Sequence, residues 1–209
     1  MTNVREDYTE RFNNFLVPVA KGIEEFIEEQ FNHHHAICSV KTRPKSVESF
    51  LEKAERKDNG TARYSDPLNQ IQDQIGALVT TRFLADVTLV EYMVKETFSS
   101  IETKMIQPDS EYEFGYIGRH FILFIPTEAW SPVTLDPPIR FFELQIKTLF
   151  QYAWSETNHK IGYKQLSQLD IEERKLTAYI AAQAWGADRA VNELHEKILK
   201  KPEGGVNHA

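Results

Sequence analysis

The most regular alternation of apolar and polar residues lies in the segment 141–148, and it predicts a strand with one apolar and one polar face. The apolar positions are Phe142, Leu144 and Ile146, and the polar positions are Glu143, Gln145 and Lys147. After Thr148, a candidate helix cap, polar side chains recur at helical spacing, at Tyr152, Glu156, His159 and Tyr163. The segment 140–164 is therefore predicted to be a strand that leads into a helix, with polar groups on both elements.

The rest of the chain predicts further helices and strands around this segment. Apolar residues at intervals of three and four indicate helices over residues 7–31, 86–98 and 171–200. Pro18 is expected to kink or split the first of them, which is a packing element and a candidate for self-association. Strands are predicted at 75–83 and 121–125, with a polar connection after residue 98 and loops at 57–65 and 127–138. The order predicts an α+β fold, a mixed β-sheet flanked by helices with helical extensions at both ends.

Length and composition limit the class of protein. The 209 residues suffice for one well-buried domain, and we expect a single domain over residues 1–209. No apolar run reaches the roughly 20 residues that span a bilayer, so no membrane partner is expected. The first residues are polar and lack a signal-peptide pattern, and the single Cys38 excludes an internal disulfide. Together these features predict a cytoplasmic protein.

The charge is distributed unevenly. The formal net charge of −7 argues against an extended nucleic-acid partner, which requires a basic surface. Residues 41–57, however, contain six basic and three acidic residues. Pro44 keeps the backbone extended and Ser46 is a candidate helix cap, so the basic side chains start at a helix N-terminus, where phosphate binding is favourable. The candidate phosphate-binding residues are Arg43, Lys45, Lys53 and Arg56.

Two carboxylates and one loop complete the candidate chemistry. Asp73 directly precedes the predicted strand 75–83, where it can present a carboxylate at the edge of the sheet. Glu143 lies on the polar face of the strand 141–148. The flanking glycines and polar neighbours of Tyr116 favour a loop, which leads through Arg119 and His120 into an apolar strand.

These residues resemble the motifs of the RelA/SpoT-type nucleotide pyrophosphokinases. The matching positions are Arg43, Lys45, Ser46 and Lys53; Asp73 and Gly76; Gly115, Tyr116 and His120; and Glu143, Gln145, Ile146, Thr148, Trp154, Glu156, His159, Tyr163 and Lys164. The chain departs from the family at Leu78 and Lys147, where arginine is usual, and at Tyr112 and Phe114, where a Lys-x-Asn motif is common. The resemblance covers residues 41–164 and implies a nucleotidyltransferase-like core. Residues 1–40 and 165–200 are then helical segments, and 201–209 is a flexible tail.

The resemblance also implies a role for each residue. Asp73 and Glu143 would hold Mg²⁺, with Glu143 alternatively acting as general base and Gln145 orienting neighbouring groups. Arg43, Lys45, Ser46, Lys53 and Arg56 would bind the phosphates of ATP. Tyr116 would stack on the acceptor base, His120 would contact the acceptor's ribose or phosphate, and Arg119 would replace the charge of the missing lysine. Lys147, Glu156 and His159 would hold these side chains in position without contacting the substrates themselves.

The activity implied is transfer of the β,γ-diphosphate of ATP to the 3′-hydroxyl of GDP or GTP, which makes (p)ppGpp. The family's larger members carry hydrolase and regulatory domains for which this chain has no room, so it resembles a small, synthetase-only alarmone enzyme. One alternative is a toxic relative that pyrophosphorylates the 3′ end of tRNA or makes an adenosine alarmone, and the departures at Leu78, Tyr112 and Phe114 keep it open. A second alternative is a degenerate nucleotide-binding domain, against which the two carboxylates argue.

Overall fold

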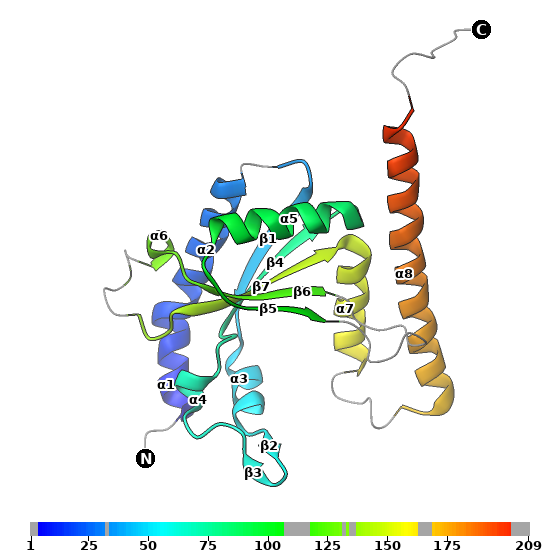
Figure 1. The fold of residues 1–209 in the computed structure, drawn as a ribbon. Helices are drawn as coiled ribbons and strands as arrows, with labels where there is room; N and C mark the ends of the chain where they lie inside the picture. Colours follow the sequence, from blue (N-terminus) through cyan, green and yellow to red (C-terminus); the bar gives the residue numbers. More distant parts are fainter. Residues whose placement is uncertain are drawn as a thin grey trace, which may run out of the picture.

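A mixed sheet forms the centre of the molecule in this computed structural model, which describes residues 4–31, 34–106, 118–130, 133, 137–162 and 169–201, without the side chains of 159–162. Its five strands lie in the order β1-β4-β7-β6-β5 (Figure 1). The strands are β1 (Ile37–Pro44), β4 (Ile75–Thr81), β5 (Ser100–Ile106), β6 (Gly118–Phe124) and β7 (Phe141–Thr148). The β4–β7 pair is parallel and the other neighbours are antiparallel. The predicted α+β fold with a mixed sheet is therefore confirmed.

Helices precede, connect and follow the strands. The N-terminal helix consists of α1 (Val4–Arg11), a π-helical turn η1 (Phe12–Leu16) and α2 (Val17–Phe31). The connecting helices are α3 (Val47–Ala54), α4 (Pro67–Gln70), α5 (Leu84–Thr97) and α6 (Thr127–Trp130). A hairpin of β2 (Lys57–Asp58) and β3 (Thr61–Ala62) lies in the predicted loop after α3. The C-terminal helices are α7 (Leu149–Gly162) and α8 (Ile171–Leu199).

The core lies between one face of the sheet and two helices. Figure 1 shows α2 and α5 on the same side of the sheet. The residues of this core with no exposed surface include Ile23, Ile27, Val90, Val94, Leu144 and Ile146. Since the apolar residues of β7 fill this core, Glu143, Gln145 and Lys147 lie on the opposite face, as the alternation predicted. Within the described part of the chain, no helix is long and apolar enough to cross a bilayer.

The structure differs from the sequence prediction at one strand near the site. Residues 100–106 form the edge strand β5, although their polar composition predicted a connection. An edge strand has only one neighbour and is exposed, so it lacks the apolar alternation that marks a half-buried strand. The predicted interruption of the N-terminal helix at Pro18 is confirmed and takes the form of a π-helical turn just before it, because proline has no N–H to continue the regular ladder.

Two helical glycines provide a stability test of the packing. A Cβ at Gly22 would clash with the backbone of Ala129 in α6, whereas a Cβ at Gly186 in α8 would meet nothing within 4 Å. Gly22→Ala should therefore lower the free energy of unfolding by about 1–3 kcal/mol. Gly186→Ala should raise it by roughly 0.5–1 kcal/mol, because alanine favours the helix. Urea unfolding of both variants checks the pair, and equal effects would contradict the close approach of α2 and α6.

Candidate functional site

Strand register places the polar residues in two rows on the open face of the sheet. Paired residues of neighbouring strands share a face, so the pairs can be followed from strand to strand. One row consists of Arg43, Gly76, Glu143 and Ile122. The next row consists of Lys41, Leu78, Gln145, His120 and Lys104. Because Gly76 has no side chain, it leaves space between Arg43 and Glu143.

Glu143 is held by two polar side chains from this face. One carboxylate oxygen, Oε1, lies 2.7 Å from Nδ1 of His120, and the other, Oε2, accepts a hydrogen bond of 2.8 Å from Nε2 of Gln145. Burial raises the pKa of Glu143, but the hydrogen bonds from His120 and Gln145 and the charge of His120 outweigh it, so the pKa lies below its ordinary value. Glu143 is therefore an ionised, oriented carboxylate at neutral pH.

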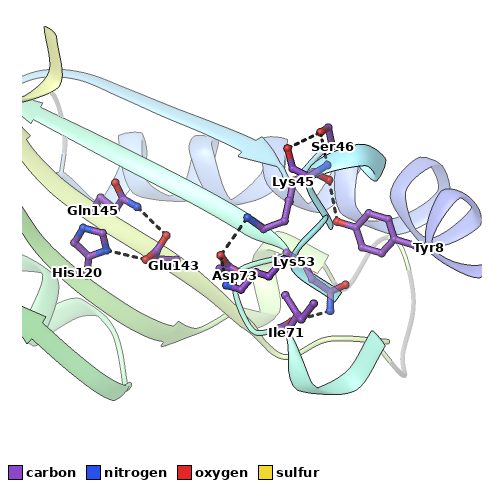
Figure 2. A network of polar contacts seen from close by, with 11 residues as sticks. Tyr8, Lys45, Ser46, Lys53, Ile71, Asp73, His120, Glu143 and Gln145 are labelled. Carbon is purple, nitrogen blue, oxygen red and sulfur yellow. Dashed lines mark hydrogen bonds and ion pairs between the residues drawn. The ribbon is translucent and has the colours of Figure 1, made fainter. Parts of the chain in front are cut away.

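Asp73 forms a second carboxylate centre with two lysines. Its Oδ2 atom lies 3.2 Å from Nζ of Lys45 and 2.8 Å from Nζ of Lys53. Burial raises the pKa of Asp73, but the charges and hydrogen bonds of the two lysines more than offset this, and the pKa is lowered. Figure 2 shows this cluster next to that of Glu143. The negative charge of Asp73 acts to raise the pKa of Glu143. The site therefore joins two anions to a group of cations.

Local structure sets the position of the two lysines. Ser46 caps α3 by accepting a hydrogen bond from the backbone N–H of Ser49 (3.2 Å), so Lys53 projects from a helix that begins directly after β1. The backbone N–H of Lys45 donates to the carbonyl of Gln74 (2.8 Å), which brings the end of β1 beside Asp73. The Tyr8 hydroxyl, on a side chain with no exposed surface, donates to the carbonyl of Lys45 (2.8 Å; Figure 2). Tyr8 was not among the predicted site residues, because it lies far from the motifs in the chain.

The donor set fits a hard divalent cation. The Oδ1 atom of Asp73 is buried without a hydrogen-bond partner among the described residues, so it has a free lone pair for a ligand. No three His, Cys, Asp or Glu side chains converge on one point in the described part of the chain. Mg²⁺ commonly takes one or two carboxylates from a protein and fills its octahedron with phosphate and water oxygens. Asp73, with Glu143 beside it, fits that mode of binding.

Lys147 lies deeper in the same face than the other cations. It is only 8% exposed, and its Nζ atom donates to the hydroxyl of Ser155 in α7 (3.1 Å). Burial lowers its pKa from 10.5 to about 8, while the charges of Glu156 and Glu143 oppose this change and Arg43 reinforces it. Lys147 is therefore an electrostatic neighbour of Glu143, of Arg43 and of Glu156, the other predicted supporting residue on α7.

The remaining predicted site residues lie in different places. Arg43 is exposed on the polar face, and Arg56 follows α3 just before the β2–β3 hairpin. Arg119 lies on the opposite face from His120, next to it in β6, and its Nε atom pairs with Glu91 of α5 at 2.9 Å. Arg119 is thus not brought together with the polar face. Tyr116 lies outside the described residues, as does the side chain of His159.

Two further lysines belong to the polar face. Lys41 pairs with Leu78 at one end of the row that contains Gln145, and Lys104 pairs with His120 at the other end. Both side chains are exposed. Lys41 was within the basic segment of the sequence, but only the β1–β4 register shows that it shares a face with Gln145. Lys104 could not be found from the sequence because β5 has no clear strand pattern.

Comparison with known proteins gives concordant results. The family described as "Region found in RelA / SpoT proteins" matches residues 42–168. The chain is 28% identical over 200 residues to GTP pyrophosphokinase YjbM from Bacillus subtilis (strain 168), which covers 89% of this chain and 88% of the relative. The crystal structure of small alarmone synthetase 1 from Bacillus subtilis matches with a TM-score of 0.73 and 22% identity, over 92% of this chain and 100% of that one. Small alarmone synthetase 2 from the same organism has a TM-score of 0.67 and 23% identity, with coverages of 90% and 100%.

The pKa of Lys147 predicts a pH dependence of stability. Between about pH 8 and pH 10.5 the folded protein binds fewer protons at this site than the unfolded chain, so stability at this site rises with pH across that window. Relative to Lys147→Met, the wild-type protein should therefore gain roughly 1–3 kcal/mol in free energy of unfolding between about pH 7.5 and pH 10. Denaturant titrations of both proteins measure the difference, and a constant difference would show that Lys147 titrates normally.

Proposed function

Since the chain belongs to the RelA/SpoT family, we propose that it is a small alarmone synthetase that transfers the β,γ-diphosphate of ATP to the 3′-hydroxyl of GDP or GTP. The observation that carries this proposal is the pair of ionised carboxylates, Asp73 and Glu143, together with Lys45, which follows β1, and Lys53 in α3. YjbM, similar along most of its length, is a GTP pyrophosphokinase. Small alarmone synthetase 1 has been crystallised with its product pppGpp and, separately, with AMPCPP, which supports nucleotide substrates here.

The cations of the site bind and polarise the donor nucleotide. In phosphoryl transfer the protein mainly positions the reactants and neutralises charge on the phosphates. Lys45 and Lys53 already pair with Asp73, and their exposed neighbour Arg43 faces the same side. Phosphate oxygens can bind these lysines in addition to Oδ2 of Asp73, since each Lys has three donors. Ser46 and Arg56 extend this group at either end of α3.

Asp73 and Glu143 would hold Mg²⁺, which supplies electrophilic stabilisation of the phosphate charge when bound. Glu143 is also positioned to accept the proton of the 3′-hydroxyl, because His120 and Gln145 orient its carboxylate and keep it ionised. Gln145 fixes one oxygen of Glu143 and His120 fixes the other. Lys147, Glu156 and His159 support this arrangement from the strand end and from α7.

The acceptor nucleotide binds on the His120 side of the face. We assign its base to Tyr116 by stacking, and its ribose or phosphates to His120. Lys104, rather than Arg119, supplies the positive charge for the acceptor phosphates, since Lys104 lies beside His120 on the polar face while Arg119 pairs with Glu91 behind the sheet. The net charge of −7 disfavours tRNA as the acceptor. The cytoplasm remains the predicted location and a homo-oligomer the predicted assembly.

The proposed reaction is tested by incubating the pure protein with Mg²⁺ and labelled ATP plus GDP, GTP, ATP or tRNA in turn. Asp73→Asn should lower turnover at least a hundredfold, because it removes the charge that faces the cation and keeps the side-chain volume. Asp58→Asn, at an exposed carboxylate in the hairpin, should retain wild-type turnover. Circular dichroism checks the fold of both variants. Near-normal activity of Asp73→Asn would show that Asp73 does not hold the metal ion. Label on tRNA and not on GDP or GTP would show that the acceptor is tRNA.

A separate test asks which cation, Lys104 beside His120 or Arg119 on the opposite face, binds the phosphates of the acceptor. Lys104→Ala should raise the KM for GDP and GTP about tenfold or more and leave the KM for ATP nearly unchanged, since a charge-assisted contact to phosphate contributes roughly 1.5–3 kcal/mol. Lys95→Ala is the control, because Lys95 is an exposed cation that pairs with Glu91 on the opposite side of the sheet. If Arg119→Ala raised the acceptor KM and Lys104→Ala did not, the acceptor charge would belong to Arg119.

A further inference from the structure

Helix α1 contacts the ATP side of the site, which comprises Lys45, Lys53 and Asp73, through the side chain of Tyr8. The Tyr8 hydroxyl donates to the backbone carbonyl of Lys45. The Tyr8 ring stacks on Phe50 of α3, with 3.6 Å between the ring centroids and 7° between the ring planes, and neither side chain has any exposed surface. Since α3 also carries Lys53, this one residue of α1 contacts both segments from which the two lysines project.

Arg11, one turn further along α1, contacts the segment that leads to Asp73. Its Nη1 atom donates to the backbone carbonyl of Leu68 in α4 and to the side-chain oxygen Oε1 of Gln74 (3.2 Å). Gln74 has no exposed surface, and its Nε2 atom donates to the carbonyls of Leu68 and Ile71 (2.8 Å each). Gln74 thus closes a turn that contains Asp73, and Arg11 bonds this turn to α1.

The contacts of Tyr8 and Arg11 meet at one hydrogen bond. The backbone N–H of Lys45 donates to the backbone carbonyl of Gln74 (2.8 Å). Tyr8 bonds the carbonyl of Lys45 on one side of this link, and Arg11 bonds the Gln74 side chain on the other side. Figure 2 shows Tyr8 pointing from the N-terminal helix toward Lys45, beside Asp73. The two side chains of α1 therefore fix where Lys45 and Asp73 lie relative to each other.

Burial keeps Tyr8 in the form that donates. Burial, reinforced by the negative charge of Asp73 and only partly opposed by the charge of Arg11, raises the pKa of Tyr8, so the phenol keeps its proton. A buried carbonyl that loses its hydrogen-bond donor is costly. Removal of this hydroxyl therefore favours a shift of the backbone at Lys45.

We propose that Tyr8 and Arg11 are positioning residues for the binding of ATP with its cation, and that they act by holding Lys45 and the turn of Asp73 at a fixed separation. Neither residue contacts a substrate. Groups that act on a substrate have to be held within about 0.5 Å of their working positions, which a hydrogen-bonded second layer achieves. The inference rests on the proposed function, because it concerns the phosphates of ATP.

The acceptor side of the site lies away from this network. His120 and Lys104, which we assign to the acceptor, project from β6 and β5, whereas Lys45 directly follows β1 at the opposite edge of the sheet. Loss of the α1 contacts should therefore weaken binding of ATP and spare binding of GDP. The N-terminal helix, predicted from the sequence as a packing element, then has a second task that differs for the two substrates.

The test measures binding without turnover, by calorimetric titration of the full chain with AMPCPP and Mg²⁺ or with GDP. Tyr8→Phe removes the hydroxyl and keeps the ring on Phe50. It should raise the Kd for AMPCPP about tenfold and leave the Kd for GDP within about twofold, as expected for one lost hydrogen bond. Tyr92→Phe is the same change at a side chain that is 62% exposed on α5, and it should leave both Kd values unchanged.

Ile27→Val separates positioning from a general loss of stability. Ile27 has no exposed surface and belongs to the core on the other face of the sheet. Loss of its methyl group should lower the Tm about as much as Tyr8→Phe does, yet leave the Kd for AMPCPP unchanged. Equal weakening of AMPCPP and GDP binding by Tyr8→Phe would show that the change is merely structural, and would overturn the proposal.

Arg11 is tested by loss and rescue. Arg11→Gln should raise the Kd for AMPCPP about tenfold, because it removes charge-assisted donors from Leu68 and Gln74. Arg11→Lys should restore most of the affinity, since an ammonium group has three donors. Folded Tyr8→Phe and Arg11→Gln variants that bound AMPCPP as tightly as the wild type would overturn this inference alone. A wild-type protein that bound neither nucleotide would overturn the proposed function, and this inference with it.

Discussion

Burial of one face of β7 is the constraint from which the site follows. Phe142, Leu144 and Ile146 have no exposed surface, and a strand cannot bury these residues without presenting the intervening ones on the other side. Glu143 therefore lies on an open face, next to Gly76 of the parallel strand β4. Since β7 is a central strand, this face receives groups from both neighbours and from the strands beyond them. The apolar core thus fixes the direction of a carboxylate that does not itself pack in the core.

Electrostatic balance explains why two half-buried carboxylates stay ionised so close together. Burial alone would favour their neutral forms and would raise the pKa of each. Lys45 and Lys53 stabilise the charge of Asp73, whereas His120 and Gln145 stabilise that of Glu143 by hydrogen bonds. Each anion therefore has partners of its own. The cations that hold Asp73 are also the groups that a bound phosphate would engage, so the resting site is already organised for an anionic ligand.

The departures from the family motifs change where positive charge lies on the polar face of the sheet. Leu78 leaves an apolar side chain in the row of Gln145, but Lys41 and Lys104 lie at the two ends of that row. This row therefore carries its positive charges at its two ends, and not at the position of Leu78. Lys147 keeps the charge of the usual arginine, yet its burial lowers its pKa, which a guanidinium would resist. The face remains cationic around two anions, with a different distribution from the one that the motifs alone suggest.

The sequence by itself determined the features that depend on near neighbours in the chain. The two-residue period of β7 predicted its polar face, and Ser46, shortly after Pro44, predicted the cap of α3, because alternation and capping involve only a few consecutive residues. Only the tertiary structure decided that Lys104 and not Arg119 shares a face with His120, and that apolar residues of α2 are buried whereas several of those of α8 are exposed. These outcomes depend on strand register and on which apolar surfaces find a partner within the fold. Both are set by contacts between residues far apart in the chain, which local periodicity does not record.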